Sequence, residues 1–126
     1  MVMAAGSDLP VEKRTAQGIS YYNGGVGLGE RARLPQEYAL KIVLVTEEGL
    51  YLNNAEVRVI NSRGEEVFRV QADNGPWLIA DVTPGTYTIE ATLEGRSSIL
   101  RGVTVKDGSK VVASLRWKSS EIDMGL

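Results

Sequence analysis

The side chains that could carry out chemistry in this chain are carboxylates, lysines and hydroxyls, because the sequence contains neither histidine nor cysteine. Without cysteine there is no thiol nucleophile, disulfide or iron–sulfur site. Without histidine there is no Ser-His-Asp triad and no imidazole base. Carboxylates adjoin at Glu47-Glu48 and Glu65-Glu66, but neighbours on a strand point to opposite faces and cannot act on one substrate. We therefore expect no catalytic residue and no cofactor.

Oxygen ligands for a hard cation are present but poorly spaced. They are Asp73, Asn74, Asp81, Asp107 and Ser109. Calcium loops of the Asp-x-Asp-x-Asp-Gly type draw their ligands from one short segment, and no such segment occurs here. The sequence therefore predicts no metal site.

A glycine-rich stretch over residues 24–30 invites a phosphate-loop interpretation. That chemistry needs a strand before the glycines and a helix N-terminus after them, so that backbone N–H groups point at the phosphate. Here Pro35 limits any helix over residues 30–34 to about one turn. We interpret these glycines as structural, with a ligand-binding loop as the alternative.

Aromatic residues beside the glycines suggest a small-ligand site. Tyr21, Tyr22, Asn23 and Gly25, joined by Trp77 from the 73–77 loop, could hold a sugar or a peptide by ring stacking and hydrogen bonding. The alternative is that one of two neighbouring tyrosines on a strand packs in the core by alternation. A concave pocket where a tyrosine and Trp77 converge would distinguish a carrier from a structural module.

Basic residues gather near the C-terminus, whereas acidic residues predominate between residues 47 and 94. The candidate basic patch consists of Arg96, Arg101, Lys106, Lys110, Arg116 and Lys118. Such a patch could attract an acidic partner or a polyanion. The alternative is that these side chains protect a sheet edge or form ordinary surface ion pairs. Nucleic-acid binding is not expected, because the net charge is −2 and no aromatic residues are interspersed among the bases.

The elements that would position these residues are strands. The chain of 126 residues, 43% of them hydrophobic, is the size of one domain. From Tyr38 onward apolar and polar residues alternate with period two, as in Leu40, Ile42 and Leu44. This pattern predicts an all-β, seven-stranded antiparallel sandwich. The expected strands are 38–46, 55–60, 65–71, 77–82, 86–93, 97–106 and 109–117.

The predicted organisation is one sandwich domain over residues 19–117. Residues 1–18 are expected to be disordered or a cloning remnant, residues 19–37 to form a glycine-rich lead-in, and residues 118–126 to form a tail. Val43 and Val45 put apolar side chains on the outer face of the first expected strand. We therefore expect that face to be covered, either by residues 19–34 or by a second copy of the chain. No apolar run approaches the roughly 20 residues of a membrane-spanning helix.

A turn in the second half of the chain carries a family resemblance. Residues 84–91 (PGTYTIEA), preceded by Gly75-Pro76-Trp77 and Val82, resemble the Pro-Gly-x-Tyr-x-Val-x-Ala signature of carboxypeptidase regulatory-like domains. Residues 21–27 (YYNGGVG) with Glu30-Arg31, and Tyr51-Leu52, look like a bacterial exported subgroup without an assigned activity. The likeness covers residues 19–117 and implies a prealbumin-like sandwich in the periplasm or outside the cell.

These observations lead to two functional hypotheses. The first is a non-catalytic exported module that acts by binding or structural assembly in the cell envelope, with a protein partner or through self-association. The second is a carrier for a small ligand that uses residues 21–29 and the 73–77 loop. Residues 1–6 lack the charged and apolar segments of a signal peptide, so the expectation of export depends on the resemblance.

Overall fold

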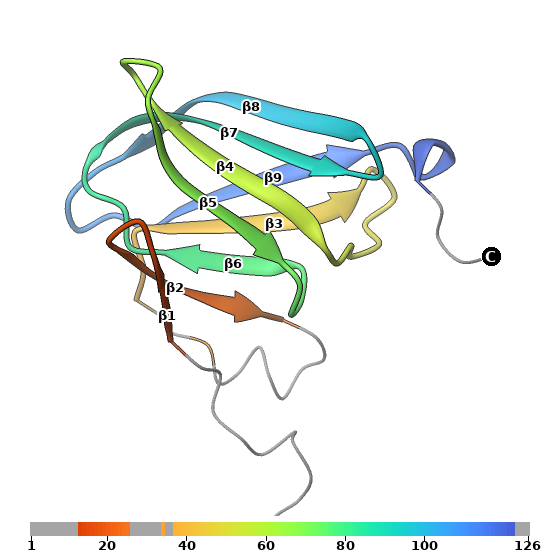
Figure 1. Cartoon of the computed structure of the whole chain (residues 1–126), viewed down its shortest axis with the longest axis horizontal. Helices are drawn as coiled ribbons and strands as arrows, with labels where there is room; N and C mark the ends of the chain where they lie inside the picture. Colours follow the sequence, from red (N-terminus) through yellow and green to blue (C-terminus); the bar gives the residue numbers. More distant parts are fainter. Residues whose placement is uncertain (1–12, 26–33, 35–36, 123–126) are drawn as a thin grey trace, which may run out of the picture.

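The protein is an all-β sandwich (Figure 1), and the computed structural model describes residues 13–25, 34 and 37–122. The expected turn of helix over 30–34 lies almost wholly outside the described residues, as do residues 1–12 and 123–126. The elements are β1 (Arg14–Ala16), β2 (Ile19–Gly24), β3 (Leu40–Thr46), β4 (Ala55–Asn61), β5 (Glu66–Ala72), β6 (Trp77–Ala80), β7 (Gly85–Leu93), β8 (Arg96–Val105), β9 (Val111–Trp117) and the 3-10 helix η2 (Ser119–Glu121).

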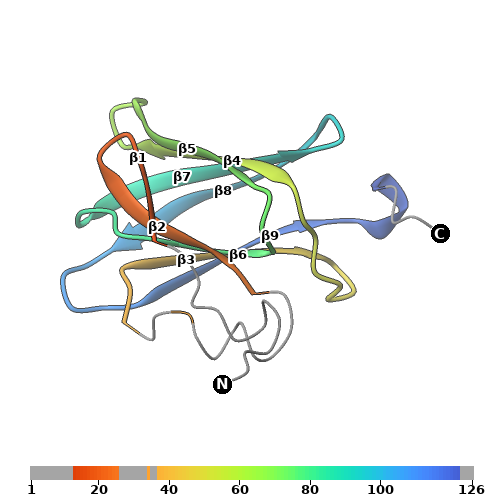
Figure 2. The same ribbon diagram turned by 60° about the horizontal axis from the view of Figure 1, so that its bottom comes forward.

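Two sheets form the layers of the sandwich (Figure 2). The five-stranded sheet has the order β1-β2-β6-β3-β9, and the four-stranded sheet has the order β5-β4-β7-β8. The seven strands expected from residue 38 onward correspond to β3 to β9. Their core faces are those that the alternation indicates, because Leu40, Ile42 and Leu44 are fully buried and so are Val57 and Val59.

The described part of the chain has nine strands, not seven, because β1 lies within residues 1–18, for which no strand was expected, and β2 lies within the lead-in. Residues 14–16 form β1 and residues 19–24 form β2, which join the five-stranded sheet through β6. A tight turn connects them at Gln17-Gly18, where φ is +52° and +82°. Glycine accepts such a conformation readily. The sequence pattern did not predict these strands, because β1 is too short to show alternation and β2 ends in glycine.

The sandwich is not wholly antiparallel, because β9 pairs with β3 in parallel over seven residues. Asp107-Gly108 is a turn sequence typical of a hairpin between two paired strands. The turn is present, with Ser109 N–H donating to Lys106 O, but β8 and β9 belong to different sheets. The turn therefore carries the chain across the sandwich, and β9 arrives beside β3 in the same direction.

The core lies between the two layers. A β-bulge at its edge explains why two apolar residues, Val67 and Phe68, are neighbours in β5. The pairing of β4 with β5 shifts register after Val59, which opposes Phe68, so that Ile60 opposes Glu66. Val67 is the extra residue of this bulge. Phe68 is consequently fully buried, while Val67 is half-buried against the edge of the core.

Candidate functional site

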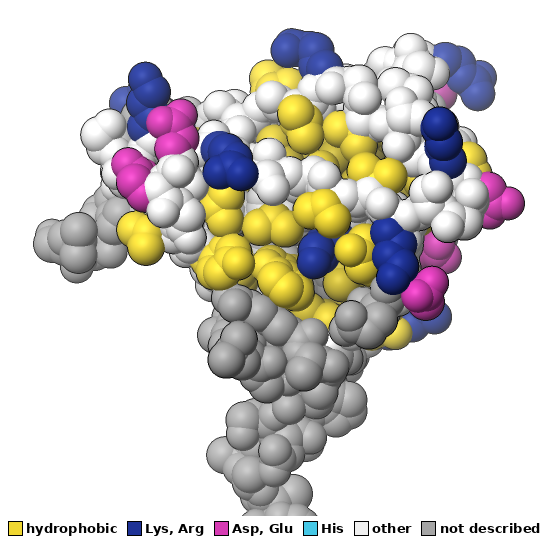
Figure 3. Space-filling view, turned by 180° about the vertical axis from the view of Figure 1, so that it is seen from behind, with side chains coloured by type: hydrophobic (Ala, Val, Ile, Leu, Met, Phe, Trp, Pro, Cys, Tyr) yellow, Lys and Arg dark blue, Asp and Glu magenta, His cyan; other side chains and the backbone are white. Residues whose placement is uncertain are grey.

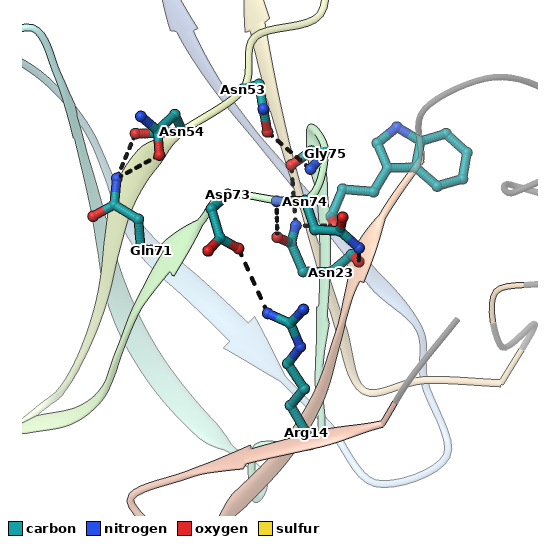
Figure 4. A network of polar contacts seen from close by, with 9 residues as sticks. Arg14, Asn23, Asn53, Asn54, Gln71, Asp73, Asn74 and Gly75 are labelled. Carbon is teal, nitrogen blue, oxygen red and sulfur yellow. Dashed lines mark hydrogen bonds and ion pairs between the residues drawn. The ribbon is translucent and has the colours of Figure 1, made fainter. Parts of the chain in front are cut away.

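The Asn23 side chain forms a set of hydrogen bonds in the region where the sequence suggested a ligand (Figure 4). We call Asn23 and these bonds the asparagine clasp. The Asn23 side chain is 2% exposed. Its Nδ2 donates to Gly75 O at 3.0 Å and to Trp77 O at 2.9 Å, and its Oδ1 accepts from Asn74 N at 2.8 Å. Asn53 Oδ1 accepts from Gly75 N at 2.8 Å. The polar atoms of Asn23 thus join β2 to the loop between β5 and β6.

Close backbone approach explains two glycines near the clasp. Gly75 has φ +138°, and a Cβ there would lie 2.2 Å from Gly24 O. Gly25, a candidate ligand residue, has φ +95°, and a Cβ there would lie 2.7 Å from Cγ of Trp77. Each glycine lets a neighbour pack against bare backbone. Packing in the fold therefore explains Gly25, while ligand binding by residues 24–30 stays a prediction.

The candidate aromatic residues separate onto two sides of the five-stranded sheet. Tyr21 points into the core, where its ring meets Phe68 edge to face at a centroid separation of 5.3 Å. Tyr22 pairs with Ile79 on the outer face. Trp77 lies on that outer face too, since its ring is 4.0 Å from Nζ of Lys41. Of the two tyrosines, therefore, Tyr22 shares a face with Trp77, whereas Tyr21 does not. Binding of a ligand through these residues stays a prediction.

We call the outer side of the five-stranded sheet the Trp77 face. The strand registers place the following residues together on it: Tyr22, Lys41, Val43, Trp77, Ile79 and Val112. Val112 is 54% exposed. Figure 3 shows hydrophobic side chains gathered on this side of the molecule, with basic side chains among and around them. The sequence pattern signalled this face through Val43, but it could not show that β6 and β9 extend it.

Ion pairs link β4, β5 and β7 on the outer side of the four-stranded sheet, where Ile99 on β8 is also exposed. Arg58 binds Glu90 on β7 and, at 2.9 Å, Glu66 on β5. Arg69 binds the same Glu66 oxygen at 2.9 Å. The hydrogen bond that Arg58 donates to Glu66 lowers the pKa of Glu66 below its ordinary value and raises the pKa of Arg58. The two outer faces of the sandwich therefore differ sharply in chemistry.

All six residues of the candidate basic patch are exposed, but they do not form one cluster. Arg101 lies within β8, and Arg116 lies on β9. Lys106 and Lys110 flank the β8–β9 turn at one end of the sandwich. Lys110 forms an ion pair with Glu37 at 3.2 Å. Arg96 and Lys118 lie at the opposite end, where Trp117 Nε1 donates to Arg96 O at 3.0 Å. The six residues are therefore spread along β8 and β9, and we call this set the β8–β9 rim.

The sequence did not predict two neighbouring hollows, of which the larger adjoins this rim at Lys106 and Lys110. The larger, ≈ 490 Å³, lies between the β6–β7 connection and the β8–β9 turn. The smaller, ≈ 270 Å³, lies beside Tyr22 and Ile79. Both are lined by Glu37, Tyr38 and Asp81. No spacing in the sequence links these residues, because they meet only once β3 and β2 have both paired with β6.

Among the described residues, no cluster of acidic side chains could hold a metal ion. No helix in that part of the chain has the length and apolar character that a membrane span requires. The chain matches no protein-family model, and a search of the curated proteins finds no match.

Proposed function

We propose that this chain is a non-catalytic, exported β-sandwich module that binds a protein partner in the cell envelope, and that the Trp77 face is its docking surface. The observation that carries the proposal is the contrast between the two outer faces. Arg58 and its glutamates close the outer side of the four-stranded sheet with ion pairs. The Trp77 face instead offers Val43, Trp77 and the exposed Val112.

The chemistry of the face indicates the kind of partner it fits. Its apolar centre favours a partner with an apolar surface of its own, because burying such surface stabilises association. The charged side chains on β3 and β9 at this face are Lys41 and Arg116. A partner with acidic residues around an apolar patch would be attracted to this arrangement and oriented by it.

Location and the absence of catalysis are supported from the sequence. The resemblance of residues 84–91 to carboxypeptidase regulatory-like domains supports a prealbumin-like fold and export to the periplasm or beyond. The lack of histidine and cysteine supports a binding role over catalysis. A sandwich of this kind is a scaffold on which a surface determines the task.

The test compares two exposed aliphatic residues on opposite outer faces. Val112 on β9 is 54% exposed, and Ile99 on β8 is 44% exposed. The wild-type chain, Val112→Ser and Ile99→Ser are immobilised, and proteins retained from an envelope extract are identified, purified and titrated against all three. Loss of one buried aliphatic side chain from an interface should weaken binding about tenfold.

We expect Val112→Ser to show this loss and Ile99→Ser to bind like the wild type. Affinity should also fall as salt is raised, because Lys41 and Arg116 contribute electrostatically. Equal binding by both variants, or no retained protein, would contradict the proposal.

A further inference from the structure

The two hollows are adjacent, and we call them together the Tyr38 groove. They share a wall made of Glu37, Tyr38, Ala39 and Asp81. From that wall one hollow extends to the β8–β9 turn and the other to Tyr22. Sites for small ligands typically measure about 300–1,000 Å³, and the larger hollow alone, ≈ 490 Å³, is within that range.

Two half-buried tyrosines line the groove, and Nζ of Lys41 and Nζ of Lys110 lie 5.6 Å and 5.9 Å from the centroid of the Tyr38 ring. Tyr38 stands at the shared wall, and Tyr22 lines the smaller hollow next to Ile79. Such rings offer a π-face to C–H groups while their hydroxyls stay available for hydrogen bonds. A ligand that suits them has one apolar flat side and polar edges.

Polar groups along the groove are balanced in charge and mixed in type. The charged residues that line its two hollows are three acids and three lysines: Glu37, Asp81, Asp107, Lys13, Lys106 and Lys110. Their formal charges cancel. Carboxylates only accept hydrogen bonds and ammonium groups only donate them, whereas a hydroxyl does both. A ligand rich in neutral hydroxyls can therefore satisfy both kinds of group, while an anion or a cation would meet as many like charges as opposite ones.

The backbone around the groove is fixed before any ligand arrives. Tyr87 donates its hydroxyl proton to Thr83 O at 2.7 Å and so holds the connection between β6 and β7. Asp81 N–H donates to Ser20 O at 3.0 Å, and Val111 N–H donates to Ala39 O at 3.1 Å. A preformed site loses less conformational entropy on binding. By contrast, the Glu37 side chain is 89% exposed in its pair with Lys110, so it can turn toward a ligand at little cost.

We propose that the Tyr38 groove binds a neutral saccharide, with a sugar ring stacked on Tyr38 and its hydroxyls bonded to Asp81 and Glu37. This is a second activity, distinct from docking of a protein on the Trp77 face, although Tyr22 and Ile79 border both the groove and that face. It also differs from a site built on the 73–77 loop, where Asn23 and Gly75 already bond to each other.

The experiment titrates the isotope-labelled chain with neutral tetrasaccharides of glucose, galactose, mannose and N-acetylglucosamine while backbone amide NMR signals are recorded. At least one sugar should shift signals of residues 37–39, 79–84 and 105–110, and not those of β4. Loss of one stacking ring weakens binding by about tenfold. Tyr38→Leu should therefore raise the Kd by that factor. Tyr51→Leu is the matched control, because Tyr51 is 46% exposed and lines neither hollow.

Asp81→Asn provides a second variant that should leave the fold intact, since Asp81 is exposed. It keeps the size of the side chain but replaces a charged acceptor, so we expect binding several-fold weaker. Val112→Ser should leave saccharide binding unchanged, which separates this proposal from the docking proposal. The inference is overturned if none of these neutral sugars shifts the groove signals, or if Tyr38→Leu and Tyr51→Leu weaken binding equally.

Discussion

Replacing Asn23 by alanine should loosen the whole N-terminal side of the five-stranded sheet. The side chain makes three hydrogen bonds and is 2% exposed. Its removal leaves the carbonyls of Gly75 and Trp77 and the N–H of Asn74 without this partner. Each buried hydrogen bond contributes about 1 kcal/mol, and a buried group left unsatisfied costs about 1–3 kcal/mol. We expect the free energy of unfolding to fall by about 3 kcal/mol.

Urea unfolding measures this change, and the melting temperature should fall by about 10 °C for a chain of this length. Amide hydrogen exchange should show where the structure opens. β2 pairs with β6 on one side and with the three-residue β1 on the other. Its amides should therefore exchange much faster in Asn23→Ala, while those of the central β4 follow global unfolding.

Asn74→Ala is the control, because the Asn74 side chain donates one bond, to Asn23 O at 3.1 Å, and Asn74 is exposed. Its loss should cost under about 1 kcal/mol. Two outcomes would show that the Asn23 hydrogen bonds do not hold β2 in the sheet. One is that Asn23→Ala destabilises the protein no more than this control, and the other is that the amides of β2 and β4 exchange at the same rate in Asn23→Ala.

Two further predictions concern backbone strain and pH. Gly75→Ala should destabilise the protein more than Gly64→Ala, as urea midpoints can show, because a Cβ at Gly75 would meet Gly24 O at 2.2 Å whereas nothing lies within 4 Å at Gly64. Both have positive φ, so even Gly64→Ala should cost about 1–2 kcal/mol, and equal losses would refute the steric argument. Because Arg58 lowers the pKa of Glu66 in the folded state, the stabilisation is present at neutral pH and is lost as pH falls below the ordinary glutamate value of 4.5. Glu66→Gln should therefore lose less stability than the wild type between about pH 6 and about pH 3, and parallel pH profiles would refute the assignment.

The alternation of apolar residues predicted the part of the fold that depends on burial. Ile89 and Leu115 lie where period two puts them, because a strand that faces a core must hide every second side chain. The same rule does not fix which strands become neighbours. The parallel pairing of β9 with β3 depends on where the chain crosses between sheets, and Asp107-Gly108 has the same turn chemistry whether or not the strands it joins are paired.

The site residues were harder to predict because their roles depend on pairing across the sheet. Tyr21 and Tyr22 are equivalent in sequence, yet one packs on Phe68 in the core and the other faces outward beside Ile79. Asn23 is a candidate ligand residue because it is polar and adjoins glycines. Its hydrogen-bond partners within the fold lie more than fifty residues away in the chain, where no local pattern could reveal them.

At both edges of the sandwich, a hydrogen bond joins one sheet to the other. On one side Arg69 N–H, on the edge strand β5, donates to Oε1 of Gln17 in the β1–β2 turn at 2.7 Å. On the other side Arg116 N–H, on the edge strand β9, donates to Oγ of Ser98 on β8 at 3.0 Å. An added strand needs such edge groups for its own ladder.

These bonds bear on how a partner approaches. A strand that paired at Arg69 or Arg116 would have to break the existing hydrogen bond of that N–H group before it formed a new one. Strand addition at these positions would therefore gain little binding free energy. The Trp77 face needs no such exchange, because burying Val112 and Val43 removes apolar surface from water without breaking a ladder. A partner should therefore dock flat on the face, and its binding should be more sensitive to Val112→Ser than to Ser98→Ala.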